Sequence, residues 1–110
     1  MKEPKSLMSL STKRNRFTFH KLALETMKYK DGLGIMFYLL NKERIGLIET
    51  EELGEGAYEP RRKGKEPYKA FRSKDLAQHF IKCFGITKAL THFEVKRVNG
   101  AVVIELIKLK

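Results

Sequence analysis

The chain has 110 residues, with 23 basic and 13 acidic side chains, and its formal net charge at pH 7 is +10. This length fits one domain, and a composition that is 42% hydrophobic excludes collagen and a wholly disordered chain. A single cysteine, Cys83, excludes an internal disulfide, and the longest apolar run, residues 33–40, is too short to cross a bilayer. With no visible secretory signal, the composition predicts a cytoplasmic protein.

The positive charge is concentrated in two stretches of the chain. Residues 1–16 hold five basic side chains and one acidic one, and residues 61–74 hold seven and one. Between them, residues 49–59 carry five glutamates and no lysine or arginine. Such segregation favours a polyanion or an anionic surface as partner.

The first half of the chain predicts an arm followed by a strand, a helix and a hairpin. Residues 1–15 are polar and predict a flexible basic arm, and the alternation of residues 16–20 predicts a short strand. The apolar side chains within residues 21–27 recur three or four positions apart, which predicts a short helix. Residues 33–40 predict a strand that is buried on both faces, with residues 45–50 as its hairpin partner.

The second half predicts a similar order of elements after a charged loop. Residues 51–67 contain three glycines and two prolines, which predicts a loop. Residues 68–72 predict a short strand, and a helix is expected between Ser73 as N-cap and Gly85. Asn99-Gly100 is the strongest short-range signal for a hairpin, here between residues 91–98 and 101–109.

Together these elements predict an α+β fold, a small mainly-β domain with two βαββ-like units. We expect a flexible arm over residues 1–15 and one compact domain over 16–110, divided into 16–50, a charged loop over 51–67, and 68–110. Because residues 101–107 are apolar on both faces, we expect one of those faces to meet another subunit or the N-terminal half.

Residues 17–50 resemble the AbrB-like (SpoVT/MazE-type) swapped-hairpin family. Phe17-Thr18-Phe19 occupies the place of that family's first strand, and His20-Lys21 the place of its Pro-Lys pair. Met27-Lys28-Tyr29 stands where the family has Leu-Gly-hydrophobic, and Lys30-Asp31-Gly32-Leu33 where it has a Lys-x-Gly-Asp turn. His20 replaces the usual proline, Lys28 the glycine and Leu33 the aspartate.

The resemblance implies a homodimeric swapped-hairpin barrel that presents basic residues to DNA. The contacts implied in this sequence are Lys13, Arg14, Arg16 and Lys21. A role in transcription regulation follows from this resemblance only. One fold hosts several functions, so the fold by itself does not determine the role.

The charged loop supplies the second set of predicted contacts. Four cations, Arg61, Arg62, Lys63 and Lys65, stand between Tyr58 and Tyr68, whose rings could stack on bases or sugars. The alternative is an exposed loop whose cations pair with the preceding Glu55 and Glu59.

Other chemistry is less well supported by the sequence. His79 and Cys83 have the helical spacing of a metal-ligand pair but lack two further ligands at suitable spacing. Glu94-x-Lys96 resembles the end of a restriction-nuclease-like metal site, which also requires an upstream aspartate, for which only Asp75 is near.

These observations predict a non-enzymatic protein that binds nucleic acid, DNA in the first instance, with no cofactor and no resident metal. The alternatives are a phage-type accessory module whose basic surface meets an acidic protein and, third, a metal-dependent nuclease.

Overall fold

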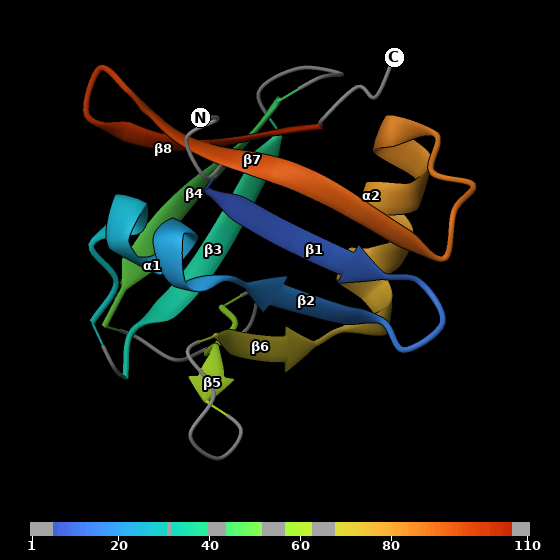
Figure 1. The fold of residues 1–110 in the computed structure, drawn as a ribbon, viewed down its shortest axis with the longest axis horizontal. Helices are drawn as coiled ribbons and strands as arrows, with labels where there is room; N and C mark the ends of the chain where they lie inside the picture. Colours follow the sequence, from blue (N-terminus) through green and yellow to red (C-terminus); the bar gives the residue numbers. More distant parts are fainter. Residues whose placement is uncertain (1–5, 31, 40–43, 52–56, 63–67, 107–110) are drawn as a thin grey trace, which may run out of the picture.

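The computed structural model describes residues 6–30, 32–39, 44–51, 57–62 and 68–106. These residues form a small mainly-β domain with two helices (Figure 1). Its elements, in chain order, are β1 (Leu7–Ser11), β2 (Arg16–Phe19), α1 (Lys21–Met27), β3 (Gly34–Leu39), β4 (Arg44–Thr50), β5 (Arg61–Arg62), β6 (Lys69–Arg72), α2 (Lys74–Phe84), β7 (Leu90–Val98) and β8 (Ala101–Leu106). No helix in the described part of the chain has the length and apolar character needed to span a membrane.

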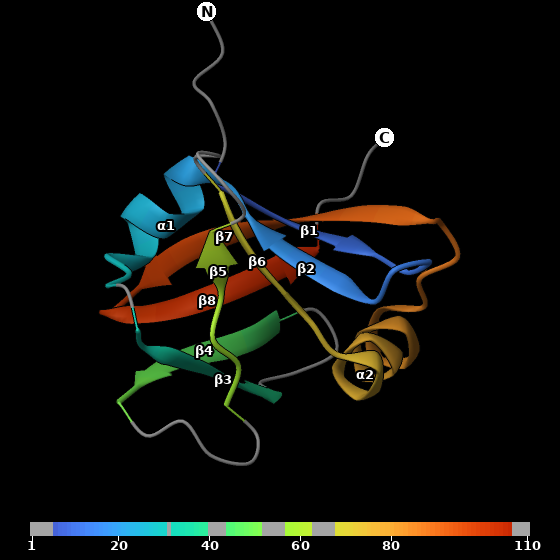
Figure 2. The same cartoon turned by 90° about the horizontal axis from the view of Figure 1, so that it is seen from below.

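The strands form one curled sheet in the order β3-β4-β8-β7-β1-β2-β6-β5, and every neighbouring pair is antiparallel. The segment before β5 returns to β3 through one bridge. The N–H of Ile35 donates to the carbonyl of Tyr58 at 2.6 Å, and the N–H of Tyr58 donates to the carbonyl of Ile35 at 2.9 Å. The curled sheet therefore meets itself at one point, and α2 lies against its remaining open side (Figure 2).

A cluster of aromatic rings fills the inside of the curled sheet. Phe17 on β2 lies 5.1 Å from Phe71 on β6 and 5.0 Å from Phe80 on α2, measured between ring centroids. Phe93 on β7 lies 5.5 Å from Phe80. Since successive strand residues point to opposite faces, the inward rings leave the polar residues between them on the outer face.

The signals for α2 and for the last hairpin are confirmed. The hydroxyl of Ser73 accepts from the N–H of Leu76 at 3.1 Å, and Gly85 ends the helix with φ of 64°. Asn99 and Gly100 have φ of 52° and 84°, as a type I′ turn requires.

The prediction of a flexible arm over residues 1–15 is wrong for Leu7–Ser11, which form β1 between β7 and β2. Met8 and Leu10 are fully buried. The domain therefore begins before residue 16. The low apolar content of the arm concealed a period-two alternation in which Met8 and Leu10 face inward and Ser9 and Ser11 face outward.

Within one copy of the chain, the strand within residues 33–40 is buried on one face only, and not on both as predicted. Ile35 is fully buried, but Met36 and Tyr38 on the opposite face are 41% and 37% exposed. The partners of β3 cover only its inner face. The outer face of β4 is partly open as well, since Ile48, the register partner of Met36, is 53% exposed.

On the second face of β8, Val103 is covered from the N-terminal half of the chain, whereas Ala101 is exposed. Val103 is 4% exposed and pairs with Gly46 on β4. The ring of Tyr38 lies over Gly46 so closely that a Cβ there would meet the ring at 2.1 Å. Glycine at this position lets the tyrosine ring lie flat against the outer face beside Val103.

Candidate nucleic-acid interface

The turn between β1 and β2 is held from both sides by distant parts of the chain. The N–H of Thr12 donates to the carbonyl of Ala89 at 2.9 Å, just before β7. The N–H of Ser73, the N-cap of α2, donates to the carbonyl of Asn15 at 3.0 Å. These two bonds bring the turn, the end of β6, the start of α2 and the segment before β7 to one corner of the molecule.

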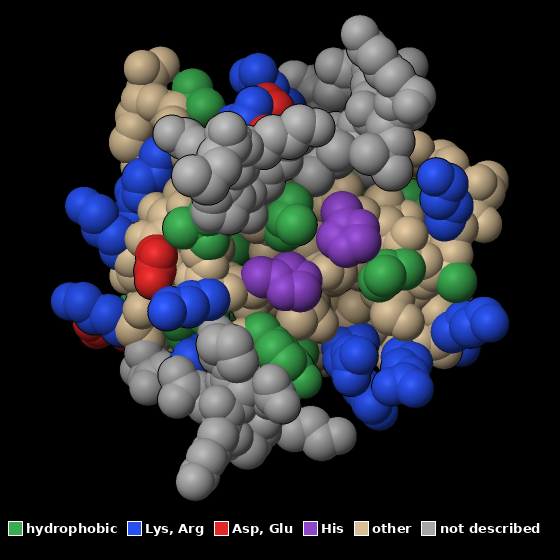
Figure 3. Space-filling view, viewed as in Figure 1, with side chains coloured by type: hydrophobic (Ala, Val, Ile, Leu, Met, Phe, Trp, Pro, Cys, Tyr) green, Lys and Arg blue, Asp and Glu red, His purple; other side chains and the backbone are tan. Residues whose placement is uncertain are grey.

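Six cationic side chains gather around this turn. Lys13 and Arg14 are exposed at its tip, and Arg72 on β6 lies directly across from Arg16 on β2. Lys74 at the start of α2 and Lys88 before β7 complete the group. We call these six residues the basic turn cluster: Lys13, Arg14, Arg16, Arg72, Lys74 and Lys88. Figure 3 shows Lys and Arg side chains along this border of the outer face.

Within the described residues, no member of the basic turn cluster forms an ion pair. The acidic residue nearest to it in sequence is Asp75, in the first turn of α2, where it complements the helix dipole. Among the described residues, six positive charges with this one carboxylate close to them in the chain give the corner a net positive charge, which attracts polyanions.

Cations on the far part of the sheet are instead used within the fold. Arg44 pairs with Glu105 at 2.6 Å, and Lys96 pairs with Glu105 at 3.0 Å and with Glu94 at 3.3 Å. Hydrogen bonds to Glu105 and Glu94 raise the pKa of Lys96, and the bond from Lys96 lowers the pKa of Glu105. Arg97 donates to the carbonyl of Thr26 at 2.7 Å.

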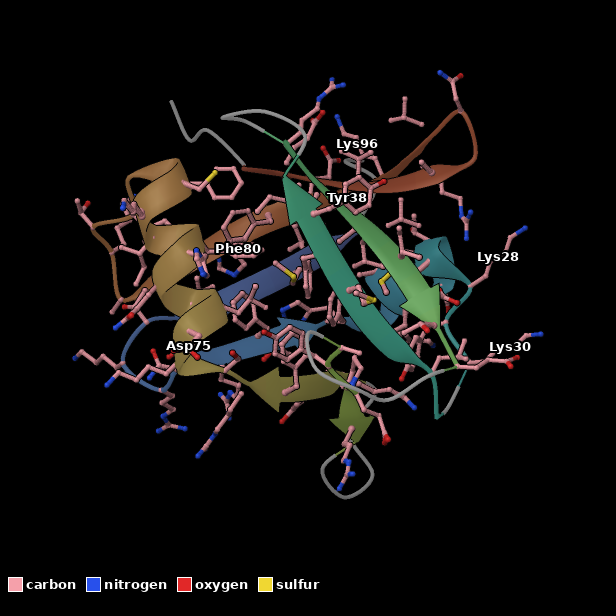
Figure 4. All side chains as sticks on the ribbon, turned by 180° about the vertical axis from the view of Figure 1, so that it is seen from behind. Lys28, Lys30, Tyr38, Asp75, Phe80 and Lys96 are labelled. Carbon is pink, nitrogen blue, oxygen red and sulfur yellow. The ribbon has the colours of Figure 1, made fainter. Side chains whose placement is uncertain are left out.

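This pairing bears directly on the nuclease alternative. Glu94 and Glu105 face each other across β7 and β8, but Lys96 and Arg44 already balance their charge. Asp75, the third residue that the motif needed, lies at the start of α2, well apart from Lys96 (Figure 4). The structure therefore does not bring the expected metal-binding carboxylates together.

Only part of the predicted site falls at the corner. Lys13, Arg14 and Arg16 do, whereas Lys21 is exposed at the start of α1, beyond the other end of β2. Arg61 pairs with Glu59 at 3.4 Å, as expected for the alternative in which the cations of the loop pair with the preceding glutamates. Arg62 is described only by its backbone, and Lys63 and Lys65 lie outside the described residues.

The two predicted stacking tyrosines differ in their surroundings. The ring of Tyr58 stacks on Phe71 at 5.0 Å and lies 6.2 Å from Phe37, so it is packed into the aromatic core. Phe71 therefore stacks against the partly buried Tyr58 ring, and the stacking of Tyr58 on a base stays a prediction. Tyr68, which directly precedes β6, is half-buried.

Sequence reasoning did not assign Arg72, Lys74 or Lys88 to the interface. Arg72 and Lys74 contributed only to the charge count of residues 61–74. One usable signal was present: alternation with the buried Phe71 puts Arg72 on the outer face, next to whichever strand pairs with β6.

A polar strip crosses the middle of the same outer face. The hydroxyl of Ser9 on β1 lies 2.6 Å from Nε2 of His20, and Ser9 pairs with His92 on β7. Burial, followed by the nearby His92, lowers the pKa of His20. Two imidazole rings are visible on this face in Figure 3.

The lowered pKa of His20 predicts acid sensitivity of the fold. Near pH 6.5 and below, the unfolded chain binds a proton at residue 20 more readily than the folded chain does. The free energy of unfolding should therefore fall as pH drops from 6.5 through the folded pKa. Urea unfolding between pH 7 and pH 5 should show a weaker pH dependence for His20→Gln than for the parent.

The matched control is His79→Gln, at an exposed histidine on α2. It should keep the pH dependence of the parent. Equal pH slopes for the parent and His20→Gln would contradict the role of His20.

His79 and Cys83, which have the helical spacing of a metal-ligand pair, both line a cavity of about 240 Å³ between α2 and β3. The other lining residues are Phe37, Tyr38, Ile45, Leu76 and Phe80. Among the described residues, no group of three or more His, Cys, Asp or Glu side chains could hold a metal ion. The cavity is therefore an apolar space beside the pair.

No family model, curated protein or solved structure matches this chain.

Proposed function

We propose that the protein binds nucleic acid through the basic turn cluster. The observation that carries the proposal is the convergence of six cations from four chain segments on one turn, without ion pairs among the described residues. Nucleic acid carries one negative charge per phosphate, and contacts with lysine and arginine release its condensed counterions.

The surroundings of the cluster favour a phosphate polymer over an acidic protein. Protein interfaces usually centre on buried apolar anchors with charges at the rim. Around the turn the outward side chains are Ser11, Thr12 and Asn15, and Leu90 is the exposed large apolar residue beside them. A positively charged surface with polar neighbours suits the backbone of a nucleic acid, because contacts with phosphates position a protein on it.

The AbrB-like resemblance of residues 17–50 extends the proposal to DNA, transcription regulation, a homodimer and the cytoplasm. Met36 and Ile48, directly opposite each other on the exposed outer face of β3 and β4, offer an apolar surface for a second copy. A dimer would have twice the 12.8 kDa mass of the chain in sedimentation equilibrium. A monomer at micromolar concentration would contradict this extension but not nucleic-acid binding.

The proposal is tested by titrating labelled duplex and single-stranded oligonucleotides of unrelated sequence with the protein at low salt. We expect a complex at micromolar protein, because nonspecific binding typically has dissociation constants of roughly 10⁻⁴ to 10⁻⁶ M at physiological salt and tightens at lower salt. No complex with either substrate would contradict the proposal.

A further inference from the structure

Two arginines of the basic turn cluster face each other across neighbouring strands. Arg16 on β2 and Arg72 on β6 are register partners. Their inward neighbours, Phe17 and Phe71, are also partners and are buried, so both arginines project from the outer face. Side chains at such positions start about 5 Å apart, and like charges placed directly opposite destabilise a sheet.

Arg16 also has a donor without an acceptor. Its Nε is buried and has no hydrogen-bond partner. A buried donor that has lost water and gained no acceptor is unfavourable, and arginine needs an acceptor because the guanidinium has five donors and no lone pair to offer. An anion between the two guanidinium groups would offset their like charges, and a change in the Arg16 side-chain conformation would bring its Nε–H to an acceptor there.

The start of α2 adds donors next to this pair. Ser73 caps the N–H of Leu76, which leaves the N–H groups of Lys74 and Asp75 without partners inside the helix. The charged side chains around the pair are Lys13, Arg14, Lys74 and Lys88, with Asp75 as the acid closest in the chain. An anion here would meet positive charge on several sides.

We infer that Arg16 and Arg72 form a clamp for a single phosphate group. The two oxygens of a carboxylate lie in one plane and suit a single guanidinium fork, whereas the non-bridging oxygens of a phosphate diverge from a tetrahedral phosphorus, so that each can accept from a different arginine. The inference rests on the proposed function, in which the clamp holds one phosphodiester and fixes the register of the nucleic acid, while Lys13 and Arg14 contact other phosphates.

The clamp is tested by thermal unfolding in inorganic phosphate and in sodium chloride of equal ionic strength. Phosphate should raise the melting temperature above its value in chloride, by about 6 °C at tenfold over its dissociation constant for a domain of this size. Arg16→Gln and Arg72→Gln should each lose this difference. Each should also melt no lower than the parent in chloride, because the like-charge pair is gone.

Two further variants separate the clamp from simple loss of charge. Arg72→Lys keeps the charge but not the planar fork, and should lose most of the phosphate effect. Lys82→Gln removes one exposed cation from α2 outside the cluster and should keep it. Equal melting temperatures in phosphate and chloride, or an undiminished phosphate effect in both glutamine variants, would overturn the inference.

The outcomes also distinguish the clamp from the proposed function. A phosphate effect that depends on Arg16 and Arg72, without any complex with oligonucleotides, would leave the clamp standing and remove nucleic acid as the polymer. A complex whose affinity is unchanged in Arg72→Gln would remove the clamp alone. Oligonucleotides with and without a 5′-phosphate should bind equally if the clamp holds a backbone phosphodiester, and a clear preference for the phosphorylated end would overturn that part.

Discussion

The double variant Lys13→Glu/Arg14→Glu is expected to bind nucleic acid at least 200-fold more weakly than the parent at about 50 mM salt. Each phosphate contact contributes a salt dependence of about −0.9 in the logarithm of affinity, or roughly 15-fold per contact at this salt. Two lost contacts therefore account for about 200-fold, and two new carboxylates add repulsion. Anisotropy titration of a labelled duplex measures the change.

The matched control is Lys28→Glu/Lys30→Glu, which makes the same change in net charge. Both lysines are exposed near the end of α1, on the opposite side of the molecule from the start of α2 in Figure 4. The control should lose much less affinity than the double variant at the turn, and both should remain folded at the temperature of the titration. Equal losses would mean that net charge, and not the basic turn cluster, governs binding.

Phe17→Ala is expected to lower the free energy of unfolding by about 3 to 5 kcal/mol, as large-to-small changes at buried phenylalanines do. Phe17 is fully buried and packs against Phe71 and Phe80, so its ring joins β2 to β6 and to α2. Since domains are stable by only about 5 to 15 kcal/mol, much of the stability would be lost. Urea unfolding measures it.

Phe84→Ala is the comparison for this variant. Phe84 is only partly buried and touches the cluster at its edge, 5.7 Å from Phe80 and 5.2 Å from Phe93. It should cost clearly less than Phe17→Ala. If Phe17→Ala cost less than Phe84→Ala, the aromatic cluster could not be the centre of the core.

Elements with local chemical signals were predictable from the sequence. The cap at Ser73, the end of α2 at Gly85 and the turn at Asn99-Gly100 each depend on hydrogen bonds and dihedral angles within a few residues. Such signals predict the same local structure independently of the tertiary contacts of the rest of the chain.

Strand β1 was missed because its burial depends on distant residues. Met8 and Leu10 become fully buried only because β7, more than 80 residues later, pairs on one side and β2 on the other. The bridge between Ile35 and Tyr58 likewise joins segments that no local pattern connects. The sequence therefore did not show that Tyr58 packs against the core.

The candidate site was predictable in its chemistry more than in its place. The charge of residues 1–16 and the AbrB-like resemblance pointed to Lys13, Arg14 and Arg16, but as part of an arm that was expected to be free. Two backbone hydrogen bonds, from Thr12 to Ala89 and from Ser73 to Asn15, add Lys88, Lys74 and Arg72 to them. In the charged loop, Arg61 forms an ion pair with Glu59. The sequence alone could not decide between this pair and a free Arg61.

The salt dependence of binding tests the interface most directly. With four or five members of the basic turn cluster on phosphates, a plot of log affinity against log salt should have a slope of about −4, which is roughly a 250-fold loss between 50 and 200 mM salt. Lys13→Glu/Arg14→Glu should make the slope less steep by about two. Binding that does not change with salt would contradict a phosphate interface and point to apolar packing against another partner.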